Sequence, residues 1–459
     1  MRLTADEIAA ATGADIVARG DAGPPRRATI DSREAGEGDL FFGLRGERAD
    51  GGAFAATAIE AGAWGAVVER SMVRSHLVGD RATNSERNPV SGWVFAVDDP
   101  LAALQALART WRRRLGARTV GITGSVGKTS VKDIARALLP GRVHANRENL
   151  NTEIGLPLTV LEAPPGTDVL VLEMAMRGSG QIAELAAIAE PEVAVITNVG
   201  PVHVELLGSV EAIAAAKAEV LAALPTDGVA VAPVEAGPLE PHLAALPRLL
   251  RFGPGGDVEA VESRVEDGVT EALVATPVGR QSFHLPFAEG HNLTNALAAI
   301  AIGVALEAPL AEMADRAANI GFSRFRGERL ELGDGIVLVN DCYNANPVSM
   351  RAALDHLASL EAGRRVAVLG EMAELGDGAP RYHAEVGDHA RAHGVDLLVG
   401  VGGPARDYGP DQLVATPAEA AELLAEQLEP GDAVLVKGSR SAGLEAVAEE
   451  LALLLEGPA

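Results

Sequence analysis

The sequence predicts an α/β fold with three domains: a small N-terminal α/β domain, a central domain on a mostly parallel sheet of the P-loop type, and a C-terminal doubly wound, Rossmann-like domain. At 459 residues the chain is longer than one hydrophobic core usually organises. Apolar strand candidates alternate with helical stretches over much of it, which is typical of parallel sheets. Apolar residues make up 47% and charged residues 22%, the balance of a globular protein.

The first domain is expected at residues 1–97, as short helices and strands ending near Ala96, with a surface loop over the polar residues 81–89. The N-terminus lacks the basic-then-apolar pattern of a signal peptide. No apolar run reaches the roughly 18 residues that a membrane span needs. We therefore expect a cytoplasmic protein with no membrane insertion.

The second domain is expected at residues 98–321. A helix at 100–115, apolar at helical spacing, precedes a strand at 118–123, a glycine-rich turn and a helix from Lys128. Further strands and alanine-rich helices are expected at 169–172, 193–197, 209–224 and 292–305. This order favours a mostly parallel sheet.

The third domain is expected at residues 322–459, after a boundary near Gly321. Apolar strand candidates separated by helical stretches lie at 336–339, 365–369, 397–401 and 433–436. Repeated strand and helix alternation predicts a doubly wound sheet.

The net charge and the few cysteine and lysine residues limit the classes of function that the protein could have. The net charge of −25 opposes binding to nucleic acid or anionic lipid. The single cysteine, Cys342, excludes an intramolecular disulfide and a cysteine-based zinc cluster. As a nucleophile it has no evident basic partner, so we expect a small semi-buried residue. Only four of the 39 basic residues are lysines, at positions 128, 132, 217 and 437. Where lysine does occur, the site is expected to need a compact ammonium or a deprotonatable amine.

The turn TGSVGKTS, residues 123–130, lies between a predicted strand and a predicted helix. This geometry directs backbone N–H groups and a helix N-terminus at a phosphate. Lys128 would neutralise β- and γ-phosphate oxygens, and Thr129 would bind Mg²⁺. Ile122 stands where the strict P-loop has glycine, so the loop is a shortened variant; the alternative is a structural glycine turn. The expected nucleotide-binding residues are Gly124, Ser125, Val126, Gly127, Lys128, Thr129 and Ser130.

Three further residues are candidates for a metal-nucleotide site. Glu173 follows the strand at 169–172, at the carboxyl edge of the sheet, and is the best metal ligand. His203 follows another strand, although a histidine there is more often structural. Lys217 lies among alanines on a helix and alone would be a surface lysine. Its amine could nevertheless take up CO₂ as a carbamate, an anionic oxygen ligand that arginine cannot form.

Together these motifs resemble the Mur ligases. The likeness begins with TGSVGKTS, Lys132-Asp133 and NLNTEIGLP at 149–157. It continues with GHNLTN at 290–295, NDCYNANP at 340–347, GEMAELG at 370–376 and KGSR at 437–440, which look like signatures of members that add D-alanyl-D-alanine. The Asp-Asn-Pro-Arg motif of the diaminopimelate- or lysine-adding relatives is absent. The sequence departs from the family pattern at Gly52, Ala175, Cys342 and Val234-Glu235.

The resemblance implies ATP, two Mg²⁺ ions and an N6-carboxylated Lys217. It implies a catalytic and metal-binding set of Lys128, Thr129, Glu173, His203 and Lys217. It places further ATP contacts at Asn292, Asn295, Arg326 and Asp341. It places substrate contacts at Asp31, Ser32, Arg33, Arg45, Gly46, Asn149, Asn151, Tyr343, Asn344, Asn346, Lys437, Ser439 and Arg440.

The implied reaction is phosphorylation of the terminal carboxylate of UDP-N-acetylmuramoyl-tripeptide by ATP, followed by attack of D-alanyl-D-alanine on the acyl phosphate. The partners would be small molecules, and we expect a monomer whose domains close on ATP. One alternative is another amide ligase of the superfamily, such as a folylpolyglutamate synthase or the tripeptide-forming relative. A second is a catalytically silent nucleotide-binding regulator. A P-loop motor or transporter ATPase would need docking repeats or membrane segments that the sequence lacks.

Overall fold

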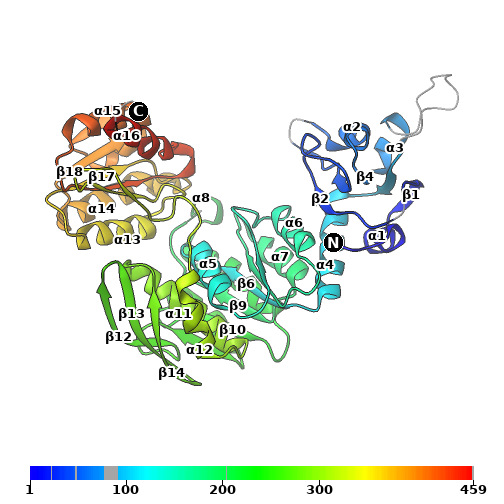
Figure 1. The fold of residues 1–459 in the computed structure, drawn as a ribbon, viewed down its shortest axis with the longest axis horizontal. Coiled ribbons are helices and arrows are strands. Elements are labelled where there is room, and N and C mark those ends of the chain that lie inside the picture. Colours follow the sequence, from blue (N-terminus) through cyan, green and yellow to red (C-terminus); the bar gives the residue numbers. More distant parts are fainter. Residues whose placement is uncertain (22, 47–48, 77–90, 203, 457–459) are drawn as a thin grey trace.

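Figure 1 shows the computed structural model of the chain, which describes residues 1–456 apart from 22, 47–48, 77–90 and 203. The loop expected at 81–89 and the side chain of His203 lie outside the described residues. Three α/β bodies follow one another along the chain, from the blue N-terminal part to the orange and red C-terminal part (Figure 1). Among the described residues, no helix is both long and apolar enough to cross a membrane.

The N-terminal body is a five-stranded sheet in the order β1-β5-β4-β3-β2, in which only β1 runs antiparallel to its neighbour. Strands β3 and β4 are almost continuously apolar because helices cover both faces of the sheet. The strands are β1 (Asp15–Ala18), β2 (Arg27–Thr29), β3 (Asp39–Phe42), β4 (Gly65–Glu69) and β5 (Trp93–Val97). The helices are α1 (Ala5–Thr12), α2 (Ala55–Glu60) and α3 (Arg70–His76).

Helix α4 (Pro100–Leu115) joins this body to the next. It begins at an Asp99 cap, and its buried residues belong to one apolar core shared by the N-terminal sheet and the central helices. The Trp111 indole N–H donates to the carbonyl of Ala163 at 3.0 Å. The Met1 ammonium donates to the carbonyl of Leu161 at 3.3 Å. The helix expected at 100–115 is confirmed.

The central sheet has six parallel strands in the order β11-β10-β9-β6-β8-β7. The alternating residues of β8 enter different cores, Leu170 and Leu172 on one face and Val171 on the other. The strands are β6 (Arg118–Thr123), β7 (Val143–Ala145), β8 (Val169–Glu173), β9 (Val193–Ile196), β10 (Val229–Pro233) and β11 (Leu249–Phe252). The helices are α5 (Lys128–Leu138), α6 (Gly155–Glu162), α7 (Gln181–Ala189), α8 (Val204–Leu207), α9 (Val210–Ala218), α10 (Glu240–Leu243), α11 (Gly290–Ala305) and α12 (Leu310–Arg316).

Two expectations for the central body need correction. Glu173 is the last residue of β8 rather than the residue after it. The helix expected at 209–224 stops at Ala218, where the backbone tightens into a 3₁₀ turn, Glu219–Ala223. The helix begins after its Ser209 cap, which agrees with the predicted start at residue 209.

A three-stranded antiparallel sheet follows, which the sequence analysis did not anticipate. Its strands are β12 (Glu259–Glu266), β13 (Val269–Thr276) and β14 (Gly279–Leu285). Strand β12 is polar and mostly exposed, so its apolar signal is weak. Val274, Phe283 and Leu285 from the other two strands pack in one core with residues of α11.

The C-terminal sheet has the order β15-β16-β20-β17-β18-β19, with only β15 antiparallel. Separate apolar cores cover its two faces, one including residues of α13 and α14 and the other residues of α15 and α16. The doubly wound prediction is confirmed. The strands are β15 (Glu328–Glu331), β16 (Val337–Asn340), β17 (Arg365–Leu369), β18 (Leu397–Val401), β19 (Gln412–Val414) and β20 (Ala433–Lys437). The helices are α13 (Pro347–Ser359), α14 (Ala379–Ala392), α15 (Pro417–Gln427) and α16 (Glu445–Glu456).

The segment between the central and C-terminal bodies is tied to the helix that follows the glycine-rich turn. The backbone N–H and hydroxyl of Ser323 donate to Asp133 on α5 at 3.0 and 2.8 Å. A second contact places His356 of α13 3.6 Å from Glu289, the residue before α11. The Ser323 hydrogen bonds and the His356 contact connect the C-terminal body to elements beside the glycine-rich turn of the central body.

Candidate active site

The glycine-rich turn lies between β6 and α5, as predicted, and Gly127 caps α5 with a φ of 79°. A Cβ at this position would lie 2.5 Å from Oδ1 of Asn295 on α11. Both the left-handed backbone and the close approach of α11 therefore require glycine.

The turn's backbone N–H groups converge. Those of Ser125 and Val126 donate to the same side-chain oxygen of Asn198, at 3.1 and 2.9 Å. The Lys128 ammonium donates to the carbonyl of Gly124 at 2.7 Å. Successive N–H groups that share one acceptor form an anion-binding concavity, so the turn has the geometry to hold a phosphate.

Glu173 lies beside the turn and is only 2% exposed. The Thr129 hydroxyl donates to one of its carboxylate oxygens and the Asn151 amide to the other, each at 2.8 Å. In the described part of the chain no cation lies within ion-pair distance of this carboxylate. A buried carboxylate is costly without a compensating charge, and a hydroxyl beside it supplies a second oxygen ligand. The pair fits a magnesium ion.

Lys217 is buried rather than at the surface, with 2% of it exposed. Burial lowers the pKa of its ammonium well below the usual value, and repulsion from Lys128 lowers that pKa further. The expectation that this residue, taken alone, is a surface lysine is therefore wrong. A lowered pKa raises the fraction of neutral amine, which is the form that reacts with CO₂.

Arg326 and Tyr343 reach this cluster from the C-terminal body. The Arg326 guanidinium lies 3.9 Å from the centre of the Tyr343 ring. Burial lowers the pKa of Lys128, and the positive charge of Arg326 contributes to that decrease. The buried Nε of Arg326 and hydroxyl of Thr123 have no hydrogen-bond partner within the described residues. The unpartnered Arg326 Nε, on a side chain close enough to Lys128 to lower its pKa, fits an anionic ligand between the two bodies.

Similarity to known proteins covers the chain in three parts. Residues 27–112 match the catalytic domain of the Mur ligase family, 122–303 the Mur ligase middle domain, and 325–440 the Mur ligase glutamate ligase domain. A Synechocystis protein named UDP-N-acetylmuramoyl-tripeptide--D-alanyl-D-alanine ligase is 38% identical, over 93% of this chain and 92% of its own. The chain belongs to the Mur ligase family.

Solved structures agree with this membership. MurF from Acinetobacter baumannii superposes with a TM-score of 0.87 at 29% identity, covering 98% of this chain and 99% of its own. MurF from Thermotoga maritima, solved in complex with ADP, has a TM-score of 0.82 at 30% identity, covering 94% and 98%. The three-domain α/β fold is that of a MurF-type Mur ligase, and members of this family are ATP-dependent ligases that form amide bonds.

In this Mur ligase, Lys437 is buried in the C-terminal body, where it connects the KGSR and NDCYNANP segments. Its ammonium is buried, lies 2.6 Å from the carboxylate of Asp341 and donates to the carbonyl of Asn344 at 2.9 Å. The buried Ser439 hydroxyl accepts from the N–H of Ala373. The KGSR segment at 437–440 therefore packs against the GEMAELG segment at 370–376. Asp341 and Lys437 were expected to contact ATP and substrate, and here they bind each other.

Several asparagines of the family motifs hold the fold around the site. Asn346 caps α13, its side-chain oxygen accepting from the N–H groups of Val348 and Ser349. On α11 the Asn295 amide donates to the Asn292 oxygen at 3.1 Å. The Asn149 carbonyl accepts from the N–H of Asn151 at 2.8 Å, which positions the amide that reaches Glu173.

The expected uridine-binding residues lie on the N-terminal body, apart from α5 (Figure 1). Asp31 and Arg33 pair with each other, and the hydrogen bond lowers the pKa of Asp31 to about 2. Arg45 and Gly46 are exposed on the same body. Ser32 is half-buried between the paired residues.

Sequence reasoning missed two side chains that shape the site. Asn198, which accepts from the turn, lies next to the predicted strand end at Thr197. Asn146 accepts the Glu173 N–H at 2.6 Å and so fixes the end of β8. Both follow parallel strands at the same sheet edge, a signal that could have found them.

The Cys342 thiol is buried, and burial raises its pKa to about 12. It lies 2.8 Å from the side-chain oxygen of Asn340. The raised pKa keeps the thiol protonated and poorly nucleophilic, which agrees with a packing residue, although the side chain is fully buried rather than semi-buried as expected.

Proposed function

We propose that this Mur ligase joins D-alanyl-D-alanine to UDP-N-acetylmuramoyl-tripeptide through an acyl phosphate, releasing ADP and phosphate and completing a peptidoglycan precursor. The observation that carries the proposal is the cluster formed by half-buried Lys128 with buried Glu173 and Lys217 beside the glycine-rich turn. Relatives that carry this activity in their names match nearly the whole chain.

The main electrostatic obstacle is that the γ-phosphate and the attacking carboxylate are both anionic. Lys128 from the central body and Arg326 from the C-terminal body supply positive charge on two sides. The turn's N–H groups, which donate to Asn198 in this structure, would orient the phosphate chain after exchanging that oxygen for a phosphate oxygen. The packed Tyr343 and Arg326 help to exclude water that would hydrolyse the acyl phosphate.

Two magnesium ions are part of the proposal. Thr129, Glu173, His203 and Lys217 would hold them, and the ions would supply Lewis-acid stabilisation of the transferring phosphate. The neutral Lys217 amine would add to CO₂, forming an N–C bond and releasing one proton, so that an anionic carbamate replaces an ammonium. That change of sign turns a residue that repels metal into a ligand.

The remaining substrate-binding roles are assigned by domain. Residues 1–97 would bind the uridine nucleotide, 98–321 ATP, and 322–459 would close over both as the third domain. Asn292 and Asn295 would contact adenine, with Asp341 near the ribose. Arg440, Asn344 and the Lys437 segment would border the peptide. We propose a cytoplasmic monomer that acts on small molecules.

Phosphate release from ATP tests the proposal when measured with UDP-N-acetylmuramoyl-tripeptide and a set of amines. Release that requires both the tripeptide and D-alanyl-D-alanine, with a product of pentapeptide mass, is the expected result. Release with glutamate or a diamino acid instead would keep the ligase chemistry and overturn the substrate. No release with any amine would favour a silent nucleotide-binding protein.

A further inference from the structure

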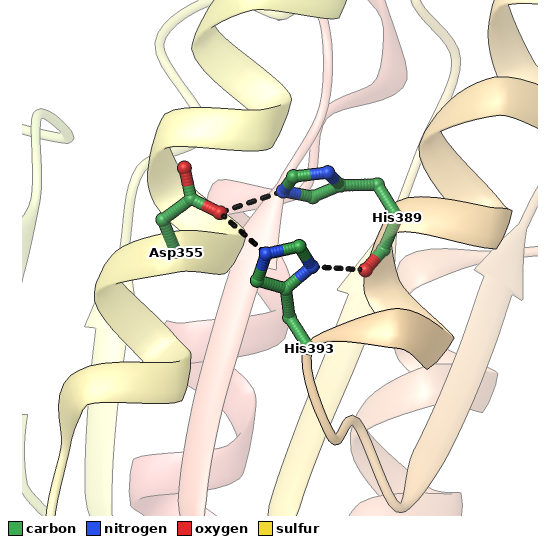
Figure 2. A group of neighbouring side chains, drawn as sticks. All are labelled: Asp355, His389 and His393. Carbon is green, nitrogen blue, oxygen red and sulfur yellow. Dashed lines mark hydrogen bonds and ion pairs between the residues drawn. The ribbon is translucent and has the colours of Figure 1, made fainter.

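A second group of potential metal ligands lies on the C-terminal body, between two neighbouring helices. Figure 2 shows Asp355 on α13 facing His389 and His393 at the end of α14. The histidines are four residues apart, so one helical turn brings both rings to the same side. The site already described does not use these residues.

Both imidazoles direct the same ring nitrogen at one carboxylate oxygen. His389 Nε2 lies 2.6 Å from Oδ1 of Asp355, and His393 Nε2 lies 3.6 Å from that oxygen. The rings stack with centroids 3.9 Å apart. The three potential ligand atoms all lie within 4.8 Å of one another.

The hydrogen bonds determine which nitrogen of His393 is free. Its Nδ1 lies 2.8 Å from the backbone carbonyl of His389, which can only accept, so Nδ1 carries the proton (Figure 2). In the neutral ring Nε2 then bears a lone pair, and that lone pair faces the Asp355 carboxylate. Two electron-rich atoms facing each other are stabilised by a cation between them.

We propose that Asp355, His389 and His393 bind a divalent transition-metal ion of the zinc class. Two imidazoles and a carboxylate suit Zn²⁺ better than Mg²⁺, which prefers oxygen ligands. Tetrahedral ligands about 2.1 Å from zinc are roughly 3.4 Å apart, a spacing that lies between the two distances measured here. Because the ligands are partly exposed, water completes the coordination. The ion links α13 to α14 and stabilises the C-terminal body.

Zinc binding to the full chain tests the proposal, measured by calorimetry and thermal unfolding with excess Mg²⁺ present to occupy oxygen-rich sites. Zn²⁺ is expected to bind and to raise the Tm of the wild type. His389→Ala and His393→Ala are each expected to weaken that binding by about tenfold or more and to remove the Tm increase. His284→Ala is the matched control, because it removes an exposed histidine that lies 3.4 Å from the half-buried Glu271 carboxylate, outside the proposed site.

Asp355→Asn provides a second measurement that does not depend on a change of volume. Co²⁺ used in place of Zn²⁺ is expected to give visible absorption bands typical of four-coordinate sites in the wild type and to lose them in Asp355→Asn. Zinc affinity and Tm increase that stay the same in both histidine variants would overturn the proposal. So would a Co²⁺ spectrum unchanged by Asp355→Asn.

Discussion

At the scale of single residues, the clearest unfavourable electrostatic interaction is that between the ammonium groups of Lys217 and Lys128. Two ammonium groups share a buried region, and each charged form is destabilised by burial and, for Lys217, by its neighbour. A proton lost from Lys217 relieves part of that cost. Carboxylation would relieve more, because the resulting anion attracts Lys128 and the metal ions instead of repelling them.

Lys217→Ala is expected to lower kcat by about 100-fold or more, because it removes an anionic ligand near the transferring phosphate. Acetate or formate is expected to restore part of the activity by supplying a carboxylate in the vacated space. Lys217→Arg is the control: it keeps a positive charge but forms no carbamate, so it should be inactive. Full steady-state activity of either variant would contradict the carbamate proposal.

Whether a site residue could be predicted from the sequence depended on whether its neighbours in the chain revealed its role. Lys128, Thr129 and Glu173 were found because each stands beside a strand end or a glycine turn. The burial of Lys217 could not be read from its helix, since the alanines around it fit an exposed face or a buried one. The pairing of Lys437 with Asp341 joins residues far apart in the chain and needed the fold.

At the scale of elements, the junction of β6, the glycine-rich turn and α5 depends on α11. Gly127 packs against Asn295, so the turn that would hold phosphate and the helix that would meet adenine are adjusted to each other. The sequence predicted both elements separately. It did not predict the three-stranded sheet against α11, because β12 alternates too weakly to separate from a loop.

Gly127→Ala is expected to displace Asn295 and to weaken ATP binding by roughly tenfold or more, since small misplacements at a reacting site are costly. Gly180→Ala is the matched control, because Gly180 also caps a helix with positive φ but has open space around it. The control should show only the backbone cost of about 1 kcal/mol. Calorimetric ATP titration compares them; equal ATP affinity in both variants would show that the contact with α11 is unimportant.

At the scale of the whole molecule, the proposed uridine site and the proposed ATP site lie on different bodies. The proposed uridine site is on the N-terminal body, and the turn proposed to bind phosphate precedes α5 of the central body, which lies apart from the N-terminal body in Figure 1. The C-terminal body already touches the central one through Ser323 and His356. The sequence predicted three domains, but how they approach depends on contacts between distant residues.

Domain closure is expected when both substrates bind, because the tripeptide carboxylate must reach the γ-phosphate. Small-angle scattering should show a smaller radius of gyration with a non-hydrolysable ATP analogue and UDP-N-acetylmuramoyl-tripeptide together. The analogue alone provides the comparison. An unchanged scattering curve with both ligands at saturation would contradict closure.

The central claim is that the buried cluster transfers the γ-phosphate to the tripeptide carboxylate before the amine attacks. The most direct measurement is mass spectrometry of the phosphate released when the terminal carboxylate carries ¹⁸O. Attack by a carboxylate oxygen on phosphorus, followed by cleavage of the carbon–oxygen bond as D-alanyl-D-alanine adds, moves one labelled oxygen into each phosphate. We predict that label in phosphate, together with the amide product. Unlabelled phosphate released with product formation would contradict the acyl-phosphate mechanism.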